Sequence, residues 1–98
     1  MLNSEDIKAV KDLIAYKNES TEKIYKFWRL GNPTLINKKD IFASNAKIFE
    51  FVRSDNEYLC THFKNKLLRK LAKEMFNNCE ITADEHLTYN SMFDPIVY

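Results

Sequence analysis

Apolar side chains recur every three or four positions along most of this chain, which is the spacing of one face of an α-helix. In the first segment Val10 and Ile14 follow this period, and Asn3 or Ser4 can cap the free amides at its start. Two acids, Glu5 and Asp6, are favourably placed against the helix dipole in the first turn. The pattern therefore predicts a helix that begins at Asn3 or Ser4.

The end of this first helix stays open. Residues 17–23 are polar, and Ser20 can cap a second helix that ends at Gly31, because glycine accepts the left-handed terminal conformation. Pro33 also disfavours helix in the residue before it. However, one heptad register spans the polar stretch; its members are Ile7, Val10, Ile14, Thr21, Ile24 and Trp28. Residues 4–30 therefore form either one long helix or two.

Two further helices are predicted in the middle of the chain. After a connector at residues 33–37, Asn37 can cap a helix that runs through Ile41 to Val52. The sequence Ser54-Asp55-Asn56-Glu57 has the form of a capping box, so the next helix is expected to start near Asp55. Its apolar ridge is formed by Leu59, Phe63, Leu67, Leu71 and Met75, and is widened by Cys60 and Leu68.

A last short helix and a tail are predicted at the C-terminus. Thr82-Ala83-Asp84-Glu85 repeats the capping-box pattern, and the helix that follows holds Leu87 and ends by Pro95. The final residues form an extended tail that is rich in apolar side chains. Four of these are candidates for docking, which we expect to occur on the bundle itself rather than elsewhere: Phe93, Ile96, Val97 and Tyr98.

Composition favours a small all-α protein. A single glycine leaves little provision for the tight hairpins of an antiparallel sheet, while 45% hydrophobic and 30% charged residues are normal for a folded domain. A chain of 98 residues has the usual size of one domain. We predict a single helical domain over residues 1–98, built as a compact bundle of four to five helices with short connections and an extended C-terminal tail.

Most aromatic side chains are expected in the core of this bundle. Phe27, Trp28 and Phe76 sit at helical spacings, which is typical of core positions. Phe49 and Phe51 are different, because they lie about 200° apart on one helix and cannot both face the same core. One of them is expected to contact another element, a second subunit or a partner.

Charge is unevenly distributed, although the formal net charge is only +1. Residues 58–73 carry five Lys or Arg side chains and no acid, whereas residues 74–98 carry five acids and no Lys or Arg. Projected at about 100° per residue, one side of the predicted helix gathers His62, Lys66, Arg69, Lys70 and Lys73. This basic face is either a solvated surface, open or covered by the acidic C-terminal segment, or a binding site for nucleic acid or an acidic protein.

The two cysteines do not indicate a disulfide or a metal site. If one helix runs from Asp55 almost to Cys79, it separates Cys60 from Cys79 by roughly 28 Å, too far for a disulfide. We expect two buried thiols in a reducing compartment. Cys60 and His62 point about 200° apart on a helix, and Cys79 with His86 supplies only two ligands, so we predict no metal.

No motif for catalysis or cofactor binding is found. The chain has no glycine-rich phosphate loop, metalloprotease signature or nucleophile elbow, so we predict that it is not an enzyme and needs no cofactor. Neither a secretory signal nor a bilayer-spanning segment is seen, which favours a cytoplasmic location, in the producing cell or in a host, and no membrane partner.

The functional prediction is a small protein-binding module that occupies a surface on a larger partner, as a regulator, inhibitor or immunity-type protein. Its richness in Asn and Lys is typical of AT-rich genomes such as those of phages or mobile elements. The alternative is a small nucleic-acid-binding regulator that uses the basic face of residues 62–73. The short joint before Asp55 invites comparison with a helix-turn-helix, but Glu50 would then occupy a buried position that suits a small residue. A homo-oligomer is compatible with either function.

Overall fold

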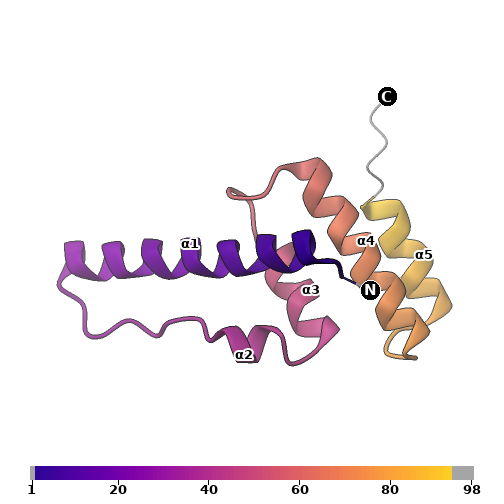
Figure 1. Cartoon of the computed structure of the whole chain (residues 1–98), viewed down its shortest axis with the longest axis horizontal. Coiled ribbons are helices and arrows are strands. Elements are labelled where there is room, and N and C mark those ends of the chain that lie inside the picture. The colour runs from indigo at the N-terminus through magenta and orange to yellow at the C-terminus, as the bar shows by residue number, and fades with distance from the viewer. Residues whose placement is uncertain (1, 94–98) are drawn as a thin grey trace.

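The computed structural model describes residues 2–93, and this part of the chain is all-helical (Figure 1). The helices are α1 (Ser4–Trp28), α2 (Lys38–Ile41), α3 (Asn45–Arg53), α4 (Thr61–Asn77) and α5 (Ala83–Met92). No strand occurs among the described residues. The predicted all-α bundle is therefore confirmed.

The core lies where α3, α4 and α5 pack with the N-terminal half of α1. Its buried apolar side chains are Val10, Leu13, Ile14, Ile48, Phe49, Val52, Leu67, Leu68, Leu71, Ala72, Met75 and Phe93. The predicted ridge of α4 is confirmed from Leu67 to Met75, and Leu59 and Phe63 pack against it while partly buried. Phe49 is buried, and Phe51 also packs against the core from a partly buried position.

Residues 4–28 form one helix, which resolves the alternative left open by the sequence. It starts with a capping box, since the Asp6 amide donates to Asn3 Oδ1 at 2.8 Å and the Asn3 amide donates to Asp6 Oδ2 at 3.2 Å. Its C-cap is Arg29, which takes the left-handed conformation with φ 52°. The expectation that Gly31 fills this role was wrong, because the cap lies two residues before that glycine.

The single helix expected from Asn37 to Val52 is in fact two. Asn37 does cap a helix, accepting from the Lys39 amide at 2.9 Å, but α2 is only one turn long. The Ser44 hydroxyl accepts from the Lys47 amide at 3.2 Å and begins α3 as a separate helix. A serine side chain in mid-pattern thus supplied a second start signal that apolar spacing did not reveal.

The capping box predicted at residues 54–57 is not formed. Ser54 instead ends α3, and its hydroxyl donates to the Phe51 carbonyl at 2.7 Å. The carboxylate of Asp55 is fully buried and accepts from three amides of the following loop, those of Glu57, Tyr58 and Leu59, at 3.3, 3.1 and 2.9 Å. Helix α4 begins only at Thr61, and loop 54–60 is longer than the turn of about three to four residues in a helix-turn-helix.

The C-terminal half of α1 projects from the bundle, and the chain returns beside it to α2 (Figure 1). Asn18 fixes the returning segment, because its Nδ2 donates to the Ile36 carbonyl at 3.1 Å and its Oδ1 accepts from the Ile36 amide at 2.7 Å. We call residues 18–37 the arm. It accounts for the elongated outline of the molecule, whose principal extents are 47 × 32 × 25 Å.

Helix α5 starts as predicted. The Glu85 amide donates to the Thr82 hydroxyl and the Thr82 amide donates to the Glu85 carboxylate, both at 3.1 Å. Phe93 follows the helix and is buried, with its ring 5.8 Å from that of Phe49. The first of the predicted docking residues therefore packs on the bundle, whereas Ile96, Val97, Tyr98 and the expected stop at Pro95 lie outside the described residues.

Candidate binding surfaces

The predicted basic residues of α4 line one side of a pocket between α4 and α5. Four of the five take part: the pocket, of about 420 Å³, is lined by Lys66, Arg69, Lys70, Lys73, His86 and Asn90. We call these six residues the basic pocket. His62 is exposed on the first turn of α4 and is not among the lining residues. The basic face is thus one wall of a concavity rather than only an outer helix surface.

Only one cation of the basic pocket has an ion-pair partner among residues 2–93. Lys70 Nζ lies 2.9 Å from a carboxylate oxygen of Asp6, whose side chain is 7% exposed. None of the six lining residues is acidic, and no ion pair within the described chain joins Glu80, Asp84 or Glu85 to this face. Helix α5 does lie alongside α4, but it contributes His86 and Asn90 to the pocket rather than carboxylates.

Two polar side chains of the pocket, those of Arg69 and His86, are held in defined surroundings. The Nε of Arg69 is buried and has no hydrogen-bond partner in the described chain, a situation that costs about 1–3 kcal/mol for a typical donor. On α5, His86 Nε2 lies 3.4 Å from Asn90 Nδ2, and the His86 ring stacks on Phe76 with centroids 4.7 Å apart. Phe76 and Asn90 thus hold the imidazole in place. The sequence did not reveal His86 or Asn90, because their position depends on how α5 packs.

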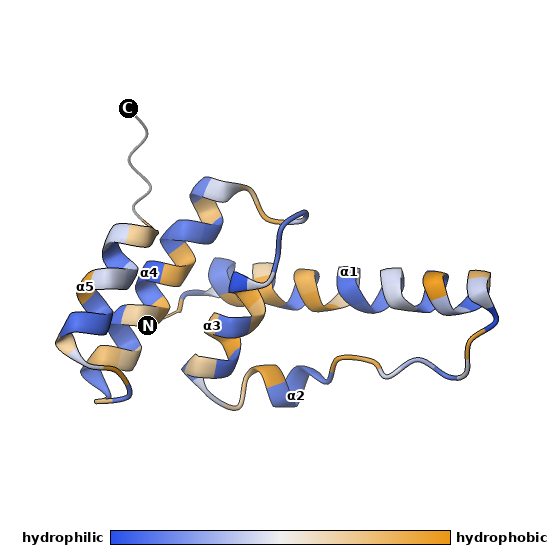
Figure 2. Cartoon of the chain, turned by 180° about the vertical axis from the view of Figure 1, so that it is seen from behind, coloured by the Kyte–Doolittle hydropathy of each residue, from blue (hydrophilic) through white to orange (hydrophobic). Residues whose placement is uncertain are grey.

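The second candidate surface is the apolar end of the arm. Ile24, Phe27 and Trp28 are 54%, 77% and 66% exposed. The expectation of a core position was therefore wrong for Phe27 and Trp28, and also for Phe76 on α4, which is 38% exposed. The rings of Phe27 and Trp28 meet edge to face at 5.1 Å. Trp28 follows Val10 by eighteen residues, or five helical turns, and therefore lies on the helix face that the bundle buries at Val10. Figure 2 shows apolar positions continuing along α1 beyond the bundle.

Basic side chains surround the end of the arm. Lys23 forms an ion pair with Glu19 at 3.0 Å, so its charge is partly offset. Lys26 and Arg29 are exposed next to Phe27 and Trp28 and have no ion-pair partner within residues 2–93. The end of the arm therefore combines an apolar centre with a positively charged edge.

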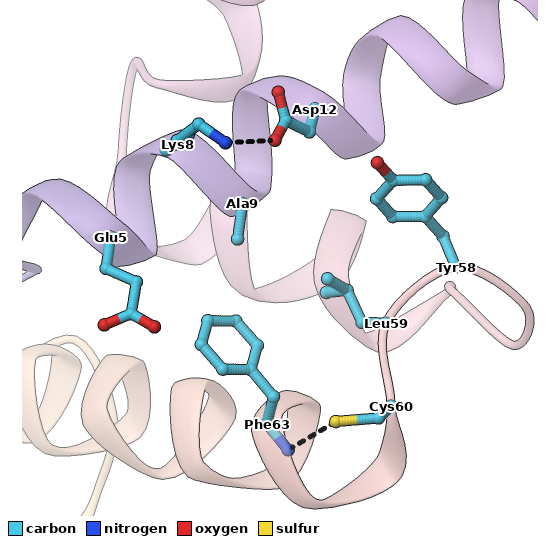
Figure 3. A pocket seen from close by; sticks show the side chains of 8 residues that line it. All are labelled: Glu5, Lys8, Ala9, Asp12, Tyr58, Leu59, Cys60 and Phe63. Atoms are coloured by element: carbon cyan, nitrogen blue, oxygen red, sulfur yellow. Dashed lines mark hydrogen bonds and ion pairs between the residues drawn. The ribbon is translucent and has the colours of Figure 1, made fainter.

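A third hollow, of about 320 Å³, lies between α1 and the start of α4 (Figure 3). Tyr58, Leu59 and Phe63 give it apolar walls, and Figure 3 shows Lys8 and Asp12 joined by an ion pair above them. Cys60 lines this hollow and accepts from the Phe63 amide through Sγ at 3.5 Å. No imidazole lines it, so it lacks the Cys–His arrangement of a thiol nucleophile.

Both cysteines are exposed free thiols, so the expectation that they are buried was wrong. Cys60 is the residue that caps α4, because loop 54–60 delays the start of that helix and moves this residue off the apolar ridge. Cys79 follows α4 with φ 60°. Within the described chain, no three His, Cys, Asp or Glu residues are grouped closely enough to hold a metal ion.

The base of the arm is attached to the bundle by loop 54–60. Burial alone raises the pKa of Asp55, but the three loop amides and Lys17, 3.8 Å away, together hold that pKa below its ordinary value. Lys64 Nζ also donates to the Asp55 carbonyl. Nearby, Tyr16 donates to Glu57 Oε2 at 3.1 Å, and this hydrogen bond raises the pKa of Tyr16. These contacts fix α1 at the point where its second half leaves the bundle.

Comparisons with known proteins assign no family to this chain, so its function is inferred from the surfaces described above. No helix within residues 2–93 has both the length and the apolar character needed to cross a membrane. No family model matches the chain, and searches of curated proteins and of solved structures found no match.

Proposed function

We propose that this protein is a small protein-binding module that occupies a surface on a larger partner, with the end of the arm as its main contact. The observation that carries the proposal is the exposure of Ile24, Phe27 and Trp28 together on a projecting helix. Large clustered apolar side chains on a surface mark interaction sites, and tryptophan is enriched among the residues that dominate binding energy.

The spacing of these residues suggests how the partner is bound. Ile24, Phe27 and Trp28 stand at positions i, i+3 and i+4, which is the arrangement of a helix that inserts its apolar face into a groove. Lys26 and Arg29 at the edge favour a groove with an acidic rim. The proposed partner is therefore a larger protein with an apolar, acid-rimmed groove, and the module acts there as a regulator, inhibitor or immunity-type protein.

Three further expectations belong to the same proposal. The protein acts without covalent chemistry, it works in the cytoplasm of the producing cell or of a host, and it originates from a phage or mobile element. A protein that acts by occupying a surface needs no catalytic residues, and the sequence contains none of the catalytic motifs considered above.

The test is affinity capture from the cognate cell lysate, followed by binding measurements with the purified partner. The variant Phe27→Ala/Trp28→Ala removes the apolar centre, and Leu87→Ala serves as the matched control because Leu87 is 65% exposed on α5. We expect the control to bind normally and the double variant to lose at least about 100-fold in affinity, a loss typical of anchor residues.

Two results would contradict this proposal. The first is equal binding of the partner by the wild type and by Phe27→Ala/Trp28→Ala. The second is a concentration-dependent dimer, seen by light scattering, that is lost in the same double variant while no other protein binds. That outcome would assign the end of the arm to a second copy of this chain.

A second candidate function is the nucleic-acid-binding regulator, which is favoured by the gathering of Lys66, Arg69, Lys70 and Lys73 on one wall. The variant Lys66→Gln/Arg69→Gln/Lys70→Gln should abolish retention on DNA or RNA at low salt, because each lost phosphate contact weakens binding. Equal retention of both proteins, or no retention of the wild type, would remove this candidate.

A further inference from the structure

We propose that the basic pocket is a binding site for a phosphate group carried by a small anion. Two alternative sources offer this chemistry, a free phosphorylated small molecule and the backbone of a nucleic acid. The pocket geometry favours the first. The proposal is independent of the arm, because it uses only residues of α4 and α5.

The first support is an excess of positive charge that ion pairs among residues 2–93 do not offset. Lys66, Arg69 and Lys73 have no ion-pair partner in the described chain, and only Lys70 is paired, with Asp6. On a helix, residues three or four positions apart are neighbours, and like charges there repel by about 0.2–0.5 kcal/mol per pair. A bound dianion would convert this repulsion into attraction.

The second support is the type of donor that the pocket contains. An arginine presents a planar fork of N–H groups that matches phosphate oxygens, and the Nε of Arg69 is buried without a partner in residues 2–93. Opposite α4, Asn90 adds an uncharged amide and His86 an imidazole from a second helix. Cationic side chains on one wall and polar side chains on the other suit the binding of a phosphate group.

The third support is the size of the space. About 420 Å³ lies within the range of roughly 300–1,000 Å³ that is typical of sites for small molecules. Because α5 forms the second wall, a ligand must enter a concavity, which suits a compact anion better than a rigid duplex. A convex stripe of lysines would instead have favoured binding to the backbone of a nucleic acid duplex.

The test is titration of the full chain with inorganic pyrophosphate, followed by calorimetry and by backbone amide NMR shifts at constant ionic strength. The variant Lys66→Gln/Arg69→Gln should weaken binding at least about tenfold. The matched control is Lys39→Gln/Arg53→Gln, which removes one exposed lysine and one exposed arginine outside the pocket. It should stay within about twofold of the wild type, and circular dichroism verifies that both variants fold.

A neutral substitution separates a built pocket from diffuse charge. Asn90→Ala removes no charge, so it should weaken pyrophosphate binding several-fold only if α5 forms part of the site. Arg69→Lys keeps the charge but loses the fork, and should also weaken binding. Absence of heat and of shifts in the wild type, or equal weakening by the Lys39→Gln/Arg53→Gln control, would overturn the proposal.

Short single-stranded and duplex oligonucleotides form the second arm of the experiment. We expect pyrophosphate to compete with a single strand and the duplex to bind weakly. If oligonucleotides bind with a steep salt dependence while pyrophosphate does not bind and Asn90→Ala has no effect, the small-anion proposal fails and the nucleic-acid function is favoured.

Discussion

The two halves of α1 differ in burial although they share one continuous helix face. In the first half, Val10 and Leu13 are completely buried, whereas in the second half Ile24 and Trp28 lie on the same side and are mostly exposed. The residue types are similar, so the difference comes from the length of the bundle and not from the helix itself. An apolar stripe on a helix thus indicates which face tends to be covered. Whether other helices of the same chain cover that face depends on how far the bundle extends along the helix.

The largest expected effect comes from shortening one apolar side chain in each half. Leu13→Ala should lower the free energy of unfolding by about 2–5 kcal/mol, because it leaves a cavity at a fully buried site. Ile24→Ala should change it by less than about 0.5 kcal/mol, since its side chain is already largely in water. Urea denaturation monitored by circular dichroism measures both. Similar losses in the two variants would show that the arm is covered in solution.

The next effect concerns the boundary between the two halves, where Asp55 holds loop 54–60 against α1. Asp55→Ala should cost about 1–3 kcal/mol, because three loop amides lose their acceptor inside the protein. Asp84→Ala is the control, since Asp84 is exposed in the first turn of α5 and contributes at most about 1 kcal/mol through the helix dipole. A smaller loss for Asp55→Ala than for the control would contradict the role of this loop.

Acidification probes the same contact with a defined sign. The pKa of Asp55 is lower in the folded protein than in the unfolded chain, where it is about 3.9. Its contribution is therefore fully present above about pH 5 and is lost as the pH falls through the folded pKa. The stability difference between wild type and Asp55→Asn should be constant from about pH 5 to pH 7 and should shrink on further acidification. A difference that grows at low pH would refute this assignment.

The smallest effect lies at the far end of the exposed half. Arg29 has a positive φ, which costs a residue with a Cβ more than it costs glycine. Arg29→Gly should therefore raise the stability by up to about 1 kcal/mol, whereas Lys26→Gly, inside the helix, should lower it by about the same amount. Thermal unfolding measures both. A loss of stability in Arg29→Gly would mean that its side chain makes contacts that outweigh the backbone strain.

Local signals in the sequence were sufficient for several features of the fold. The caps at Asn3 and Thr82 depend on groups three residues apart, and the ridge from Leu67 to Met75 depends on spacing along one helix. The role of Asp55 could not be predicted from such local signals. Residues 54–57 also fit a capping box, but the Asp55 carboxylate instead accepts from the amides of residues 57–59 and is buried 3.8 Å from Lys17, which is remote in the sequence.

The candidate surfaces show the same limit. The basic face of α4 was predictable because Lys66, Lys70 and Lys73 recur with the helical period. The opposite wall was not, since His86 and Asn90 reach the pocket only through the packing of α5. The exposure of Trp28 was also hidden, because nothing near it in the sequence indicates where the bundle ends.

The length of α1 also has a consequence for stoichiometry. A rise of about 1.5 Å per residue places Trp28 roughly 27 Å beyond Val10, and the basic pocket lies on α4 and α5, which do not form part of the arm. Under the two proposals made above, the partner protein and the anion occupy different elements of the fold. One copy of the protein would then bind both at the same time, and neither ligand would displace the other.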